Sequence, residues 1–245
     1  MKLDKVYIIT LDLSDENKKS ILERLNLMGV PNKTTYTIFD GVNGRELFST
    51  QQGRLDYGIK FYGGWKLNDS NEFWNRDVTT GEAGGMCSHI KVWEDGYKNG
   101  YENILILEDD YNPEQPFPWD VCNELENYKY DILFLSRRLQ SGHSDIDVGL
   151  EHFVVPGYSY QTHSYIVSKS GLEKLVETHL PTLKQNIIVS DEFLPSTYTK
   201  HPREDIRGMY QRNISALAYK HNIITQLRFE ALGNSLTSPI EGIDY

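Results

Sequence analysis

The stretch NILILEDDYNPE, residues 103–114, places four consecutive apolar residues, Ile104–Leu107, directly before the acids Glu108, Asp109 and Asp110. A continuous apolar run of this length, followed by turn formers, is typical of a strand buried on both faces of a sheet. Ligands gather beyond the carboxyl ends of the strands in parallel sheets. The three acids therefore follow the strand at the place where a ligand site is expected.

Further strands and helices alternate around this run. Strand patterns cover Val6–Leu11, Thr35–Phe39, Asp131–Leu135 and His163–Ser168. Helices are predicted from Ser14 to about Met28, from a T-x-x-E capping box at Thr79 to about Lys98, and from an S-x-x-E box at Ser170 to about Leu180. This alternation predicts an α/β fold with a mostly parallel sheet and helices on both faces.

No boundary divides the chain, so residues 1–245 are predicted to form one domain, which is long enough to bury a sizeable core. Residues 48–78 are rich in Gly, Asn, Asp and aromatic residues and lack clear periodicity. This composition predicts a long surface excursion and a candidate lid.

Composition and charge exclude several classes of protein. The formal net charge of −10 argues against a nucleic-acid binder, which needs a basic surface. The two cysteines are too few for a disulfide framework or a zinc cage. The sequence contains no signal-peptide pattern, no apolar stretch of about 20 residues for a membrane span and no retention signal. These features predict a cytoplasmic protein, and they leave the oligomeric state open, with a homodimer as one option.

The acids that follow the apolar run Ile104–Leu107 suit a cation. In an extended backbone Glu108 and Asp110 point to one side and Asp109 to the other. Two carboxylates on one side repel unless a cation lies between them, and their oxygens suit Mg²⁺ or Mn²⁺. Such an ion usually bridges to a diphosphate. The alternative is a solvated turn, which DDYNPE also fits and which composition alone slightly favours.

A second acidic pair, Asp191 and Glu192, follows the apolar run 187–189. Either acid is a candidate general base that would take a proton from an attacking hydroxyl. The alternative is that Ser190 caps a helix and both acids lie in its first turn, and spacing alone favours this alternative.

Two other segments carry candidate binding groups. In GEAGGMCSHIKVWE, residues 81–94, glycines near a helix start let a backbone approach phosphate or sugar. Glu82 there suits a ligand role and its capping box equally well. An apolar stripe along this predicted helix consists of Ala83, Met86, Ile90, Trp93 and Tyr97. His89 lies off this stripe, which predicts an exposed side chain. The hydroxyl-rich segment GYSYQTHSY, residues 157–165, either grips a sugar or forms a polar loop before a strand.

Taken together and in this order, five segments resemble glycosyltransferase family 25, which includes lipooligosaccharide and collagen glycosyltransferases. They are residues 5–30 (KVYIITLDLSDENKKSILERLNLMGV), 79–110 (TTGEAGGMCSHIKVWEDGYKNGYENILILEDD), 130–138 (YDILFLSRR), 154–175 (VVPGYSYQTHSYIVSKSGLEKL) and 189–202 (VSDEFLPSTYTKHP). DEFLP…KHP and GYSYQTHSY look most like the collagen-modifying branch, whose enzymes glycosylate hydroxylysine.

The resemblance implies a nucleotide-sugar-binding fold of the GT-A type, a UDP-sugar donor and a divalent cation, usually Mn²⁺. It implies that Glu108 and Asp110 hold the metal, that Asp109 completes the acidic motif, and that Asp191, with Glu192, is the base or acceptor-binding candidate. The residues that it places with the donor are Thr10, Leu11, Asp12, Asp40, Gly81, Glu82, Ser88, His89, Asp109, Tyr160 and Arg228.

This chain departs from the family pattern at two places. Gly85 stands where the family commonly has a cysteine, and Arg228, in QLRF, stands where the collagen enzymes have a histidine. Arg228 is therefore predicted to contact the pyrophosphate in place of a histidine metal ligand.

The leading hypothesis is a metal-dependent transferase that moves galactose or glucose from a UDP-hexose to hydroxylysine or galactosylhydroxylysine of a collagen-like peptide. One alternative is transfer to a lipopolysaccharide or lipooligosaccharide glycan. Another is a non-catalytic module that binds a sugar or nucleotide.

Overall fold

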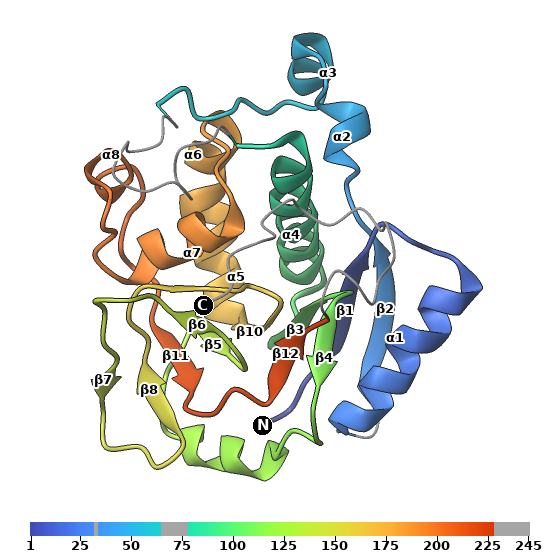
Figure 1. Cartoon of the computed structure of the whole chain (residues 1–245). Coiled ribbons are helices and arrows are strands. Elements are labelled where there is room, and N and C mark those ends of the chain that lie inside the picture. Colours follow the sequence, from blue (N-terminus) through green and yellow to red (C-terminus); the bar gives the residue numbers. More distant parts are fainter. Residues whose placement is uncertain (32–33, 65–77, 228–245) are drawn as a thin grey trace.

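The computed structural model describes residues 1–31, 34–64 and 78–227, and an eight-stranded sheet forms its centre (Figure 1). In order across the sheet the strands are β2 (Thr35–Asp40), β1 (Lys5–Thr10), β3 (Asn103–Glu108), β10 (Ser164–Ser168), β5 (Ile132–Phe134), β11 (Ala216–Tyr219), β8 (Phe153–Val155) and β7 (Ile146–Asp147). Two smaller sheets pair β4 (Tyr111–Pro113) with β12 (Ile224–Gln226) and β6 (Arg138–Leu139) with β9 (Ser159–Tyr160).

Most strands of the central sheet run in one direction. β1 is parallel to β2 and β3, and β11 is parallel to β5. β10 and β8 are antiparallel to both of their neighbours, which leaves six of the eight strands pointing the same way. The predicted α/β class with a mostly parallel sheet is confirmed, with β10 inserted in the opposite direction beside β3.

Helices lie on both faces of this sheet, as the alternating pattern predicts (Figure 1). They are α1 (Asp15–Met28), α2 (Gly44–Leu47), α3 (Gln51–Asp56), α4 (Thr80–Asn99), the 3₁₀ helix η2 (Trp119–Leu125), α5 (Lys169–Glu173), the π-helical segment η3 (Lys174–His179), α6 (Leu180–Gln185), α7 (Ser190–Tyr198) and α8 (Glu204–Arg207). Among the residues described, no helix has the length and apolar character needed to cross a membrane.

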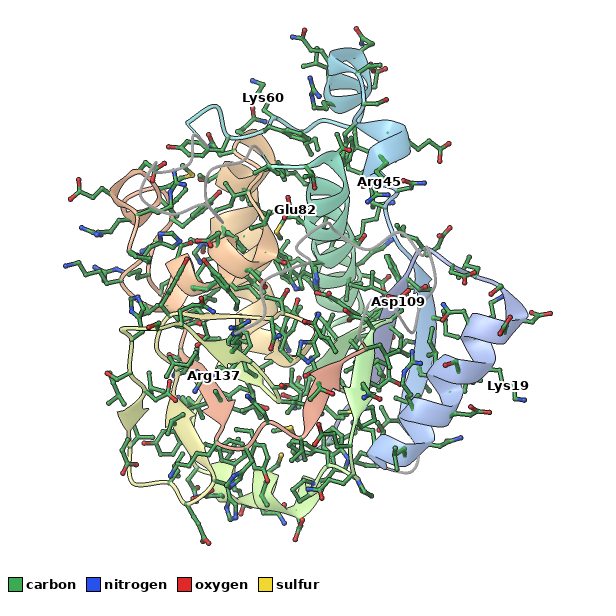
Figure 2. The ribbon with its side chains drawn as sticks, in the orientation of Figure 1. Lys19, Arg45, Lys60, Glu82, Asp109 and Arg137 are labelled. Carbon is green, nitrogen blue, oxygen red and sulfur yellow. The ribbon has the colours of Figure 1, made fainter. Side chains whose placement is uncertain are left out.

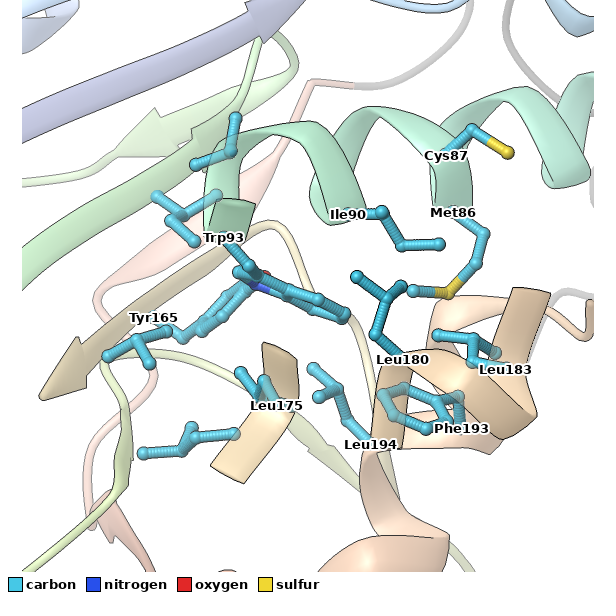
Figure 3. Packing of buried hydrophobic residues seen from close by; sticks show 14 of the residues in the cluster. Met86, Cys87, Ile90, Trp93, Tyr165, Leu175, Leu180, Leu183, Phe193 and Leu194 are labelled. Atoms are coloured by element: carbon cyan, nitrogen blue, oxygen red, sulfur yellow. The ribbon is translucent and has the colours of Figure 1, made fainter. Parts of the chain in front are cut away.

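Side-chain alternation along β3 divides the interior into two cores. Ile104 and Ile106 belong to a core that they share with α4, whereas Leu105 and Leu107 belong to a core that they share with α1. Figure 3 shows the first core, in which Trp93 of α4 lies between β10 and α7. Both faces of β3 are therefore buried, which confirms the prediction for ILIL.

The starts of α1 and α4 are as predicted. Ser14 Oγ accepts a hydrogen bond from the Asn17 N–H at 3.2 Å, and Thr79 forms a complete capping box with Glu82. Both caps satisfy N–H groups that have no partner within the helix.

The predicted cap at Ser170 was wrong. Ser168, the last residue of β10, caps α5 by accepting from the Gly171 N–H at 3.2 Å. The Ser170 hydroxyl instead donates to the buried carboxylate of Asp131 at 2.7 Å, and a buried carboxylate needs such a partner. The helical stretch also runs past Leu180, through η3 and α6.

The segment predicted as a surface excursion, residues 48–78, lies partly in the core. Phe48 and Ile59 are buried on either side of α3, and Phe61 forms a bridge with Ile187. Residues 65–77 fall outside the described ranges, so the predicted lid stays a prediction.

Two adjacent glycines of α4 have opposite surroundings. A Cβ on Gly84 would lie 2.4 Å from the Val42 carbonyl oxygen and 2.5 Å from the Gly44 nitrogen. A Cβ on Gly85 would have no atom within 4 Å. Gly84 therefore permits a close backbone approach, but the partner is the loop before α2, not the predicted phosphate or sugar.

We expect Gly84→Ala to lower the free energy of unfolding by about 1–3 kcal/mol, because the added methyl group overpacks this contact. Gly85→Ala is the matched control, and it should leave stability unchanged or raise it, since alanine favours an exposed helix position by about 1 kcal/mol over glycine. Urea unfolding of both variants measures the difference. Equal stability of the two variants would contradict the close approach of α4 to α2.

Candidate active site

Thr10, at the end of β1, links that strand to the acids after β3. Its Oγ1 donates a hydrogen bond to Asp109 Oδ2 at 2.5 Å and accepts from the Asp12 N–H at 3.0 Å and from Asn17 Nδ2 at 3.1 Å. Figure 2 shows Asp109 beside β1. Thr10 is buried, and its hydrogen bonds connect the end of β1 to the turn after β3 and hold Asp109 in place.

The three acids point to different partners. β3 ends at Glu108, and the next two residues form a turn into β4, so the extended alternation used to predict a metal pair stops there. Glu108 Oε1 accepts from Thr162 Oγ1 at 3.1 Å and lies 3.1 Å from His89 Nε2. Asp110 Oδ2 accepts from Gln226 Nε2 at 2.9 Å, which turns Asp110 toward β12.

The acids differ in how readily they ionise. Burial, followed by the charges of Glu108 and Asp109, raises the pKa of Asp110 well above its usual value. Burial and the Glu108 charge also raise the pKa of Asp109, although Thr10 opposes them. Burial acts to raise the pKa of Glu108 as well, but the hydrogen bond from His89 and further polar partners hold it below its usual value. Glu108 is thus the carboxylate that the fold keeps ionised.

Asp110 has the features expected of a cation ligand. Its Oδ1 is buried and has no hydrogen-bond partner, and a nearby positive charge would offset the cost of ionising it. In the part of the chain that the structure describes, no three His, Cys, Asp or Glu side chains are grouped to hold a metal ion. Mg²⁺ sites commonly use one or two carboxylates and complete their shell with water and substrate phosphates. The unpartnered Oδ1 of Asp110 suits one such ligand position, and in Glu108 the oxygen left for a cation is Oε2, because Thr162 and His89 both contact Oε1.

His89 is buried, at 2% exposure, and the predicted exposed position was wrong. Its Nδ1 lies 2.8 Å from Tyr165 Oη, which also accepts from Trp93 Nε1 at 3.0 Å. Since Tyr165 accepts that proton, its own hydroxyl can donate to Nδ1, and Nε2–H then donates to Glu108. The apolar stripe of α4 does not reveal this position, because the polar partners come from the sheet.

Asp191 lies in the first turn of α7 and faces the loop before β10. Its Oδ1 accepts from the Thr162 N–H at 3.1 Å, and Ser190 Oγ lies 2.9 Å from Thr162 Oγ1. The side chain of Ser190 therefore does not cap the helix, although both acids do lie in the first turn. Burial, with the charge of Glu108, raises the pKa of Asp191 to about 6.

Glu192 does not fit its predicted catalytic role, because it is 0% exposed. Its Oε2 accepts hydrogen bonds from Tyr158 Oη and lies 2.5 Å from His201 Nε2, and burial raises its pKa well above the usual value. Tyr160 is partly buried, and its hydroxyl lies 3.0 Å from that of Tyr158. Glu192 is enclosed by these groups and has no surface that a substrate could reach.

The predicted donor-binding residues after β1 and β2 are accessible. Leu11 is 38% exposed, and Asp12 and Asp40 are exposed beside it at the carboxyl ends of these strands. Asp12 also accepts from the Ser14 N–H at 2.9 Å, which fixes the turn into α1. Arg228 lies outside the described residues.

The predicted donor-binding residues of α4 make mostly internal bonds. Gly81 lies in the first turn, and the Glu82 carboxylate serves the capping box (Figure 2). Ser88 is buried, and its hydroxyl donates to the Gly84 carbonyl at 2.9 Å and accepts from the Val42 N–H at 2.8 Å. Ser88 thus holds the loop after β2 against α4.

Sequence reasoning missed Thr162, Tyr165 and Gln226, which hold the acids or their partner His89. Thr162 and Tyr165 lie within the hydroxyl-rich segment 157–165, which was the available signal. Gln226 carries no signal, since only the pairing of β12 with β4 brings it to Asp110.

We expect Asp191→Asn to raise the melting temperature at pH 8 by about 2–6 °C. The folded chain raises the pKa of Asp191 from 3.8 to about 6, so native stability falls as pH rises through this interval and stays lower above it. Asparagine removes that cost and keeps the acceptor for the Thr162 N–H, so the gain should be smaller at pH 4.

Asp147→Asn is the control, because Asp147 is exposed and accepts a backbone N–H from Gly149 at 3.0 Å. Thermal unfolding at both pH values tests the pair. A gain at pH 8 that is equal for the two variants would show that Asp191 is not destabilised by its surroundings.

Relatives of this chain carry glycosyltransferase names. It is 30% identical over 222 residues to a glycosyltransferase 25 family member of Aedes aegypti, with 88% of this chain and 34% of that protein covered. It is 30% identical over 226 residues to procollagen galactosyltransferase 1 of Danio rerio, with 89% and 35% covered. It is 28% identical over 225 residues to a probable inactive glycosyltransferase 25 family member 3 of Bos taurus, with 89% and 36% covered. The chain thus spans about a third of the length of these relatives.

The family description "Glycosyltransferase family 25 (LPS biosynthesis protein)" matches residues 3–194. This range contains β1, α4, β3, β10 and the start of α7, and it contains every predicted site residue except Arg228. The match confirms the resemblance noted in the sequence: the chain belongs to glycosyltransferase family 25.

Proposed function

We propose that this glycosyltransferase moves a hexose from a UDP-sugar to a hydroxyl group of collagen, on hydroxylysine or galactosylhydroxylysine. The observation that carries the proposal is the placement of Asp191: Thr162, which holds it through a backbone N–H, also contacts Glu108 at the end of β3. The similarity to procollagen galactosyltransferase 1 supports the acceptor class.

On the donor side, the exposed residues Leu11, Asp12 and Asp40 are available to the nucleoside. Asp110, through its unpartnered Oδ1, and Glu108 would hold Mn²⁺ or Mg²⁺. When bound, such a cation neutralises charge on the diphosphate leaving group. Asp109 accepts a hydrogen bond from Thr10, so its carboxylate is directed toward β1 and not toward the proposed cation between Asp110 and Glu108.

On the acceptor side, Asp191 acts as the general base. With a pKa of about 6, it is mostly ionised at neutral pH and still basic enough to accept a proton from an attacking hydroxyl. The acceptor oxygen bonds to the anomeric carbon as the bond to UDP breaks, and the hydroxyl proton moves to the Asp191 carboxylate. A direct displacement of this kind inverts the anomeric configuration.

Two other functions have support. Transfer to a lipopolysaccharide-type glycan is suggested by the family description. Absence of transfer, with binding as the remaining function, is suggested by the relative named probable inactive. The presence of carboxyl groups at Asp110 and Asp191 favours transfer over binding alone.

The acceptor is tested by incubating the chain with Mn²⁺, each common UDP-sugar and one of three acceptors. These are a hydroxylysine peptide, a galactosylhydroxylysine peptide and a lipooligosaccharide glycan. We expect mass spectrometry to show one added hexose on a collagen peptide. Addition to the glycan alone would establish the first alternative, and UDP binding by calorimetry without any transfer would establish the second.

Removal of the candidate metal ligand is a separate test. We expect Asp110→Asn to lower transfer about a hundredfold or more, because a neutral amide binds Mn²⁺ far more weakly than a carboxylate, and chelator should have a similar effect on the wild type. Mn²⁺ binding measured by calorimetry in the presence of UDP should weaken in parallel. Asp147→Asn is again the exposed control. Full activity of the wild type in chelator would refute the metal-dependent mechanism.

A further inference from the structure

The connection between β9 and β10 contains a strained residue. Gln161 has φ of 72°, and within the described ranges it is the one residue other than glycine with a positive φ. Residues of this type rarely adopt a left-handed conformation unless surrounding contacts impose it, and such strain often occurs at functional sites. Here the strained residue immediately precedes Thr162.

Thr162 contacts two carboxylates that belong to different elements. Its N–H donates to Asp191 Oδ1 at 3.1 Å, and its hydroxyl donates to Glu108 Oε1 at 3.1 Å. Because a hydroxyl has one proton, the 2.9 Å contact with Ser190 Oγ is a bond that Thr162 accepts. One residue therefore joins the end of β3 to the start of α7.

An ordinary buried threonine in the same chain shows what is unusual here. Thr197 is also buried, and its hydroxyl donates to the carbonyl oxygen of Leu194 within its own helix at 2.7 Å. That bond serves the local backbone only. Thr162, at 5% exposure, uses its backbone and its side chain on two charged groups, and hydrogen bonds to charged groups are the stronger kind.

We infer that Thr162 is a positioning residue that holds the donor-side carboxylate of Glu108 and the acceptor-side carboxylate of Asp191 in a fixed relation. The inference rests on the proposed function, because that proposal assigns Glu108 to the donor side and Asp191 to the acceptor side. Thr162 is too deeply buried to bind substrate, so it acts on the reaction through the two carboxylates. The strained backbone at Gln161 directs the Thr162 N–H toward Asp191 while the hydroxyl faces Glu108.

The test compares Thr162→Val, Thr162→Ser and the control Thr197→Val in the transfer assay. We expect Thr162→Val, which loses the hydroxyl but keeps the shape, to lower kcat about ten- to hundredfold. The acceptor KM should stay within about threefold of wild type, because no contact with the acceptor is lost. Thr162→Ser keeps the hydroxyl and should restore most of the rate, and Thr197→Val should retain it.

Melting temperatures show whether each variant folds. If Thr162→Val does not fold, Ser190→Ala replaces it, because loss of the Ser190 proton frees the Thr162 hydroxyl to turn away from Glu108, and kcat should fall several-fold with the acceptor KM unchanged. The inference is overturned if Thr162→Val and Thr197→Val have the same kcat, or if only the donor KM changes. A wild-type chain that transfers no hexose would instead overturn the proposed function itself.

Discussion

The candidate site depends on one charge, the Glu108 carboxylate at the end of a strand buried on both faces. It lies 3.1 Å from both His89 Nε2 and Thr162 Oγ1, and these partners hold its pKa below the usual value against the effect of burial. Its charge in turn contributes to the raised pKa of Asp110 and of Asp191. The ionised Glu108 carboxylate thus makes Asp110 and Asp191 harder to ionise. A cation would stabilise the ionised form of Asp110, and the raised pKa of Asp191 lets it accept a proton near neutral pH.

The core beneath the site makes this arrangement rigid. His89 reaches Glu108 because α4 packs on the face of the sheet that carries Ile104 and Ile106 of β3. Tyr165 bonds to His89, and the Trp93 indole N–H in turn bonds to Tyr165. A chain of hydrogen bonds therefore runs from the apolar core to the charged group, and every ring in it is buried. A substitution that changes the packing of Trp93 or Tyr165 would therefore also change the hydrogen bond between His89 and Glu108.

Local patterns in the sequence were sufficient for five strands of the central sheet, β1, β2, β3, β5 and β10, but they did not predict β7, β8 and β11. Long-range contacts limited the prediction of the site. The apolar run before Glu108 and the cap at Thr79 depend on neighbouring residues, and both predictions were confirmed. The bonds from Glu108 to His89 and Thr162 join residues 19 and 54 positions apart, and only the pairing of strands and the packing of α4 bring them together. The same limit explains the wrong cap at Ser170, whose hydroxyl is taken by Asp131, 39 positions away.

Helix geometry separates the roles of two acids that the sequence alone could not distinguish. Consecutive residues of a helix point about 100° apart. Asp191 therefore faces Thr162 and the site, while Glu192 faces Tyr158 and His201 in the interior. Burial lowers the pKa of His201 to about 4, so its ring is neutral and can donate Nε2–H to Glu192. This buried contact anchors the first turn of α7, in which Asp191 also lies.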